Sequence, residues 1–252
     1  MPEDGIQLIE LEDGFQCYTS SEAEARFIHR EIFQDDTYDL DGLPDDPVVV
    51  DAGANIGLFT LFVKRRYPAA RVIAFEPVPD NIRVLKKNLR LHGIHDVTVH
   101  PVCLGAEPAA AADFTYFRRM PGNSTRHPEG LALQKTLMAA HMGEEQAEAA
   151  LEPTRITVPV DRLSDVLAAR HPGTGPIDLM KIDVEGAELD LLRGVDAADW
   201  ERTRAVIIEV SALDGVRAEV ERTLRERGLT VSGARAPFMW PELELYNVTA
   251  RR

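Results

Sequence analysis

The stretch VVVDAGANIG at residues 48–57, followed by FEP at residues 75–77, decides the fold. An apolar strand runs into a glycine-spaced turn and then a helix, and a second strand ends on a carboxylate. Gly53 and Gly57 lack a Cβ atom where the backbone must bend sharply and lie close to a ligand. Glu76 occupies the position from which an acid accepts ribose hydroxyl hydrogens in dinucleotide folds. The pattern predicts a nucleotide-binding turn, although the same glycines would also permit a tight turn with no ligand.

Strands and helices alternate from residue 48 onward, which predicts a parallel sheet covered on both faces. The strands are continuous apolar runs, as expected where both faces are buried. We expect strands at 48–51, 71–75, 97–102, 177–182 and 204–210, and a closing pair at 229–231 and 243–248. We expect helices at about 57–66, 79–92, 161–170, 185–193 and 215–227.

Two segments lie outside this alternation. We expect residues 1–46 to form an N-terminal extension that caps the site, with a hairpin over 6–18 and a helix that SEAE at 21–24 opens as a capping box. Residues 47–252 form the main domain. Within it, residues 108–153 are an insertion with a strand at 114–117, a loop and a helical stretch. An insertion beside a binding crevice is typical of a lid or substrate wall, whereas a solvated flap or a homodimer contact is the alternative.

Charge and composition restrict the partners. The chain has 42 acidic and 28 basic residues and therefore a net charge of −14. This charge disfavours binding to nucleic acid and to anionic membranes. Cys17 and Cys103 cannot make a disulfide framework or a cysteine zinc site. The first fifteen residues carry five acids and no Lys or Arg, unlike a signal peptide, and no apolar run reaches the roughly 20 residues of a membrane span. We therefore expect a soluble, cytoplasmic protein.

Several motifs together resemble one family. VVDAGANIGLFT at 49–60 is similar to the first motif of the FkbM family of S-adenosylmethionine (SAM)-dependent methyltransferases, and IDLMKIDVEGAE at 177–188 resembles its second hallmark. LRG at 192–194 and YNV at 246–248 also fit, while FIHREIF at 27–33 and PGNS at 121–124 resemble members linked to polyketide and peptide pathways. The resemblance covers residues from about 21 to 250.

The resemblance implies a Rossmann-like class I methyltransferase fold, with a seven-stranded sheet that is mostly parallel and has an antiparallel last strand. It implies SAM as cofactor and methyl transfer to a hydroxyl of a small natural product (a polyketide, a peptide or a sugar), free or tethered to a carrier protein. The crevice at the carboxyl ends of the strands is the expected cofactor site. The residues expected there are Asp51, Gly53, Ala54, Asn55, Gly57, Glu76, Pro77, Val102 and Asp183.

An alcohol is a weak nucleophile, so a base that takes its proton assists transfer. Asp183 is the first candidate for this base because it ends a buried strand, and Glu185 on the next turn is the second. For both acids, capping of the following helix is the alternative role. His127 and His29, which titrate near neutrality, are further candidates. Lys181 shares a strand face with Asp183, and in so apolar a strand it needs a carboxylate partner. The histidines suggest no metal triad, and no metal is expected.

Other interpretations stay open. The acceptor could be an amine instead of a hydroxyl. The crevice could serve an NAD-dependent oxidoreductase or epimerase, although the Gly-x-Gly-x-x-Gly spacing is missing. A SAM-binding module without turnover is the non-enzyme alternative. Glu209, at the end of its strand, could face the crevice, and the aromatic loop 238–240 could form either an acceptor wall or the edge of the core.

Overall fold

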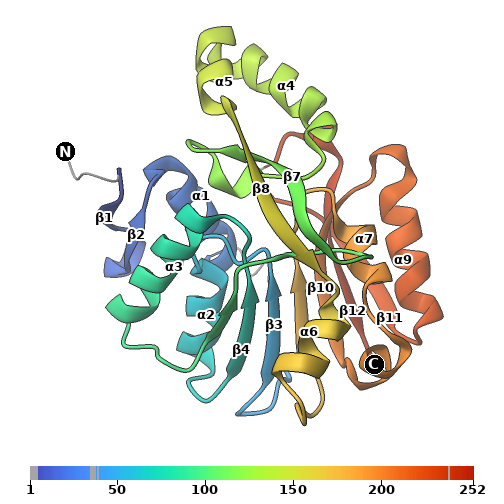
Figure 1. Cartoon of the computed structure of the whole chain (residues 1–252). Helices are drawn as coiled ribbons and strands as arrows, with labels where there is room; N and C mark the ends of the chain where they lie inside the picture. The colour runs from blue at the N-terminus through green and yellow to red at the C-terminus, as the bar shows by residue number, and fades with distance from the viewer. Residues whose placement is uncertain (1–4, 35–37, 39, 238) are drawn as a thin grey trace.

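The computed structural model describes the 252-residue chain except for residues 1–4, 35–37, 39 and 238 (Figure 1). Its centre is a seven-stranded sheet in the order β11-β12-β10-β9-β3-β4-β5. The strands are β3 (Val48–Ala52), β4 (Arg71–Phe75), β5 (Thr98–His100), β9 (Leu179–Ile182), β10 (Ala205–Ser211), β11 (Thr230–Arg235) and β12 (Leu245–Arg251). Neighbours from β10 to β5 pair in parallel, whereas β12 runs antiparallel to both β10 and β11. The predicted α/β sheet with a reversed last strand is confirmed.

Helices cover both faces of this sheet. On one face, Val49, Leu179 and Ile207 pack with residues of α1 (Glu22–Phe33), α2 (Leu58–Arg66) and α3 (Pro79–Leu91). On the other face, Val50 and Met180 pack against α6 (Leu163–Arg170), α7 (Glu188–Arg193), α8 (Ala197–Arg202) and α9 (Val216–Glu226). The strands are apolar on both sides because both sides are buried. Figure 1 shows the two helical layers flanking the strands.

The N-terminal extension contains the expected hairpin, β1 (Gln7–Glu10) with β2 (Gln16–Thr19), and then α1. Asn88 of α3 fixes the hairpin to the main domain. Its amide accepts a hydrogen bond from Tyr18 N (2.6 Å), and it donates to Tyr18 O (3.0 Å) and to Ile56 O (2.8 Å). The same side chain therefore holds both the hairpin and the turn that follows β3.

The predicted capping box at residues 21–24 does not form. Ser21 occupies the N-cap position of α1 without a side-chain cap, because its Oγ donates to Arg119 O (2.8 Å). Glu24 accepts instead from Gly122 N (2.8 Å). Both side chains are drawn away from their own helix to the backbone of the insertion, so the segment starts a helix as predicted but serves a tertiary contact.

The insertion belongs to a second, three-stranded sheet of β6 (Cys103–Leu104), β8 (Pro153–Asp161) and β7 (Ala109–Phe117), in that order. The expected helical stretch is α4 (Ala132–Met142) and α5 (Glu144–Ala150). Strand β8, whose buried Val158 and Val160 flank Pro159, was not predicted from the sequence. Prolines disfavour a central strand, so local rules give little support to this one. Figure 1 shows β7 and β8 crossing the sheet toward α4 and α5.

Gly194, at the end of α7, generates a stability prediction. A Cβ atom there would lie 2.2 Å from Gly105 O, which follows β6. Gly194→Ala should therefore force backbone atoms apart and lower the free energy of unfolding by about 1–3 kcal/mol in urea titrations. Gly175→Ala, which meets nothing within 4 Å, is the matched control. Equal stability of the two variants would refute this close contact between α7 and the second sheet.

Candidate functional site

The turn after β3 takes the conformation that its sequence predicts. Gly53, Asn55 and Gly57 all have positive φ angles, 79°, 47° and 90°. A Cβ atom on Gly53 would lie 1.8 Å from the backbone oxygen of Asp183, so only glycine fits between the ends of β3 and β9. Gly53 N and Ala54 N donate to Phe75 O at 3.0 and 2.9 Å. The turn is thus fixed between the carboxyl ends of two neighbouring strands.

Glu76 follows β4 and is 4% exposed. Its Oε2 accepts from Asn55 N (2.9 Å), and its Oε1 accepts from Val78 N (2.8 Å) and Asn81 Nδ2 (3.3 Å). Burial raises its pKa to about 7, against the effect of these hydrogen bonds. A carboxylate has about four acceptor positions, so one remains on Oε2 for a ligand hydroxyl. The sequence predicts that Glu76 accepts hydrogen bonds from ribose hydroxyls, but most of its acceptor positions already accept from Asn55, Val78 and Asn81.

Most backbone N–H groups of the turn already have partners within the protein. Those of Gly53, Ala54 and Asn55 donate to Phe75 O and to Glu76, and Gly57 N donates to Ala54 O (2.8 Å). Asn55 itself, which the sequence also predicts as a cofactor residue, differs because its side-chain Oδ1 is buried without a hydrogen-bond partner among the described residues. An unpartnered buried acceptor beside Glu76 is a position that a ligand N–H group would satisfy.

Lys181 connects the acids of β3 and β9. Its Nζ donates to Gly53 O (2.7 Å) and lies 3.5 Å from Asp51 Oδ1 and 3.3 Å from Asp183 Oδ2. Burial lowers the pKa of Lys181, but Asp183 and Asp51 outweigh it and the net shift is upward. Asp51 is fully buried, and burial raises its pKa; its Oδ2 accepts from Thr60 Oγ1 (2.6 Å). Asp51 therefore fixes the turn, and Lys181 has the carboxylate partners that the sequence requires.

Asp183 and Glu185 lie on the same rim. Asp183 N donates to Ala52 O (3.1 Å), and its side chain is 32% exposed. Since α7 begins only at Glu188 and has Ala187 as its N-cap, neither acid caps the helix. Burial raises the pKa of Glu185 well above its usual range, and the charge of Asp183 adds to this. The two acids expected from the sequence are thus close enough to influence each other.

The remaining predicted cofactor positions border the same edge. Pro77 is half-buried directly after Glu76, and Ala54 is buried in the turn. Val102 is also half-buried, and its N–H donates to His100 O (3.0 Å) where the chain leaves β5.

The two candidate histidines differ in their surroundings. His127 lies on the insertion loop, with Nε2 3.7 Å from Asp190 Oδ2, and it borders Gly186, the residue directly after Glu185. Thr125 Oγ1 donates to Glu185 O (2.5 Å) from the same loop. His29 is 3% exposed, and its ring stacks on Phe33 at 4.5 Å. The geometry leaves His127 as a candidate base and gives His29 a packing environment in the extension.

The sequence predicts that the extension covers the site, but it did not reveal the contacts that attach the extension to the insertion. Gly122 lies between Glu24 and Asn55, since a Cβ atom on it would be 3.1 Å from Glu24 Oε1 and 3.3 Å from Asn55 Nδ2. Burial raises the pKa of Glu24 to about 8, opposed by the hydrogen bond from Gly122 N. The extension and the insertion therefore meet beside the β3 turn. The signal was present in residues 21–24, but it has the form of an ordinary capping box.

Three further observations concern candidates raised above. Trp240 stacks on His141 at 5.0 Å and packs in the cluster around Met138, which favours the core interpretation of its loop; Phe238 lies outside the described residues. In the described part of the chain, no three His, Cys, Asp or Glu side chains are grouped to hold a metal ion. None of the described helices is long and apolar enough to cross a membrane.

Comparisons with known proteins agree with the sequence motifs. A family model described as "Methyltransferase FkbM domain" matches residues 51–229. The chain is 36% identical to 31-O-demethyl-FK506 methyltransferase FkbM of Streptomyces tacrolimicus, over 99% of this chain and 98% of that protein. It is 40% identical to methyltransferase sdnD of Sordaria araneosa, over 98% and 96% respectively. These relatives favour methyl transfer over the NAD-dependent alternative.

A solved structure supports the fold. The crystal structure of methyltransferase FkbM from Methylobacillus flagellatus KT has a TM-score of 0.53 and 18% identity, over 84% of this chain and 46% of that one. At this identity the likeness concerns the fold alone.

Glu24 generates a pH prediction. Its pKa in the folded protein, about 8, lies above the ordinary 4.5, so the folded state holds a proton that the unfolded state releases. The resulting stability is fully present below pH 4.5 and is lost as the pH rises through about 8. Glu24→Gln keeps the acceptor for Gly122 N but cannot ionise. Urea unfolding at several pH values should therefore show a shallower loss of stability in this variant than in the wild type.

The exposed neighbour Glu22 provides the control on the same helix. Glu22→Gln should retain the wild-type pH dependence. If Glu24→Gln retains it as well, Glu24 is ionised in the folded protein across this range, which contradicts a raised pKa for this carboxyl group.

Proposed function

The chain belongs to the FkbM methyltransferase family, and on that premise we propose that it transfers the methyl group of SAM to a hydroxyl oxygen of a natural product or sugar. One observation carries the cofactor assignment. The buried, unpartnered Asn55 Oδ1 and the remaining acceptor position on Glu76 Oε2 lie at one turn, since Asn55 N donates to that same Oε2. SAM carries an ammonium group and ribose hydroxyls, the donors that such acceptors require.

The residues of the turn fit this cofactor. Glu76 would accept a ribose hydroxyl, and Asn55 Oδ1 would accept from the ammonium group. Gly53 and Gly57 keep the backbone free of side chains at the place where the ligand would lie closest. When bound, SAM supplies an electrophilic methyl group on a positively charged sulfur. The protein's remaining task is to align the acceptor and to take its proton.

Asp183 is the proposed base. Its carboxylate is partly exposed at the rim, while Lys181 holds Oδ2 at 3.3 Å and fixes its direction. From this position the carboxylate could reach the hydroxyl of an acceptor and take its proton. Glu185 and His127 are alternatives on the same rim. Transfer to oxygen is favoured over transfer to nitrogen by the name of the Streptomyces tacrolimicus relative, which specifies an O-demethyl compound.

Glu76→Ala tests the cofactor site. Loss of a hydrogen bond to a charged group costs about 1.5–3 kcal/mol, so SAM should bind roughly 10- to 150-fold more weakly by isothermal titration calorimetry. Asp80→Ala removes a nearby acid from the exposed side of α3 and should leave the affinity unchanged. Unaltered affinity of a folded Glu76→Ala protein would exclude ribose binding at this carboxylate.

Asp183→Asn tests the base. Removing a general base slows transfer by about 10²- to 10⁴-fold, and SAM affinity should change little. Labelled SAM with 31-O-demethyl-FK506 as the first acceptor provides the assay, followed by other hydroxyl-bearing natural products. Glu219→Gln, on the distant helix α9, is the control. A variant that keeps the wild-type rate would transfer the role of base to Glu185 or His127.

A further inference from the structure

A row of polar side chains crosses one face of the sheet beyond the cofactor turn. Lys181 lies level with Ile207, and Glu209 follows two residues later on the same face of β10. Asn247 is directly opposite Glu209 on β12. Because Ile207 packs with the cluster that includes α1 and α2, Glu209 and Asn247 face the side that the N-terminal extension covers.

Among the described residues, neither Glu209 nor Asn247 finds the hydrogen-bond partners that a buried polar group needs. Asn247 is 8% exposed, and its Oδ1 has no hydrogen-bond partner within the described residues. Glu209 is half-buried, and no described side chain donates to its carboxylate in the hydrogen bonds of this structure. Directly opposed residues on antiparallel strands have Cβ atoms about 5 Å apart. Two neighbouring acceptors thus lie on this face of the sheet without a donor from the described residues, at a cost that a ligand would relieve.

The surroundings of Glu209 are acidic. Burial raises its pKa well above the usual range, and Asp183 and then Glu31 of α1 add to this effect. Lys181 acts in the opposite direction, but its ammonium group is held by Gly53 O and by two carboxylates. An anionic group on an acceptor would be repelled here. Burying a charged group costs more than burying a hydroxyl group, so these two shielded positions favour hydrogen-bond donors without charge over a cation.

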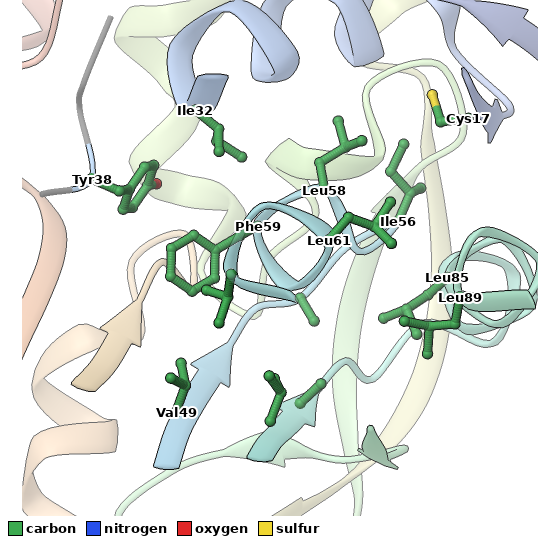
Figure 2. Packing of buried hydrophobic residues seen from close by; sticks show 14 of the residues in the cluster. Cys17, Ile32, Tyr38, Val49, Ile56, Leu58, Phe59, Leu61, Leu85 and Leu89 are labelled. Atoms are coloured by element: carbon green, nitrogen blue, oxygen red, sulfur yellow. The ribbon is translucent and has the colours of Figure 1, made fainter. Parts of the chain in front are cut away.

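Tyr38 of the extension lies on the same side of the sheet. It is 6% exposed, and its ring packs against that of Phe59 on α2 (Figure 2), with 5.0 Å between the ring centroids. Burial raises the pKa of the Tyr38 hydroxyl, and the negative charges of Asp183, Glu31 and Glu209 raise it further. The hydroxyl therefore lies among the same acids, beside the proposed base.

We propose that Glu209 and Asn247 form the acceptor subsite and select an uncharged acceptor that brings two hydrogen-bond donors, such as neighbouring hydroxyl groups. This inference rests on the proposed methyl transfer. Glu209 and Asn247 bind one part of the acceptor, so that another hydroxyl lies at Asp183. They determine specificity and take no proton themselves.

The test compares Glu209→Gln and Asn247→Ala with the wild type, using labelled SAM. The acceptors are 31-O-demethyl-FK506, methyl glucoside, and the amino sugar and sugar phosphate that correspond to this glucoside. Each variant should bind SAM as the wild type does and show an acceptor KM raised roughly tenfold or more. The wild type should prefer the neutral compounds. Thr249→Ala, on the same face of β12 opposite Ile207, is the matched control and should keep the wild-type KM.

Each other outcome has a definite meaning. If the wild type does not bind SAM, the proposed function itself fails. If SAM binds but both variants keep the wild-type acceptor KM, only the subsite is refuted. A preference for the amino sugar or the phosphate, or no transfer to any neutral compound by the SAM-bound wild type, would overturn the proposed acceptor class. Urea unfolding of both variants identifies a loss that comes from misfolding.

Discussion

The buried ammonium group of Lys181 is the contact on which the site depends. It is surrounded by Asp51, Asp183 and the carbonyl of Gly53, and so joins β3, β9 and the turn that follows β3. Breaking a buried ion pair by removing one partner costs about 3–5 kcal/mol, because the remaining charge stays buried alone. Because the strands around Lys181 are apolar, a charged group without a partner would be strongly destabilising there. The same contact that stabilises the carboxyl ends of β3 and β9 therefore also fixes the direction of the Asp183 side chain.

Much of the fold follows from local sequence. Apolar runs such as Val48–Val50 predict strands buried on both faces, and the alternation with helices predicts a parallel sheet. The turn could be predicted because Gly53 and Gly57 permit positive φ angles that other residues rarely adopt. The position of Glu76 at the end of β4 follows from the same reasoning. These features depend on neighbours along the chain, which the sequence shows directly.

The features that could not be predicted depend on contacts between distant segments. Ser21 and Glu24 have the spacing of a capping box, yet their partners lie nearly a hundred residues away on the insertion. Strand β8 contains two prolines that local rules place outside a central strand, and its pairing with β7 supports it there. The hydrogen bonds of the turn after β3 also could not be predicted from the sequence. Whether Gly53 N meets a ligand or Phe75 O is decided by how two strands pack.

The junction between the extension and the insertion has a consequence for the divergence of such enzymes. The hydrogen bonds from Ser21 and to Glu24 reach backbone atoms of the insertion, the carbonyl of Arg119 and the amide of Gly122. Main-chain groups are the same in every residue type except for the missing N–H of proline, so these two bonds do not depend on which side chain stands at position 119. The sequence of this loop can thus vary without rebuilding the part of the protein that holds it.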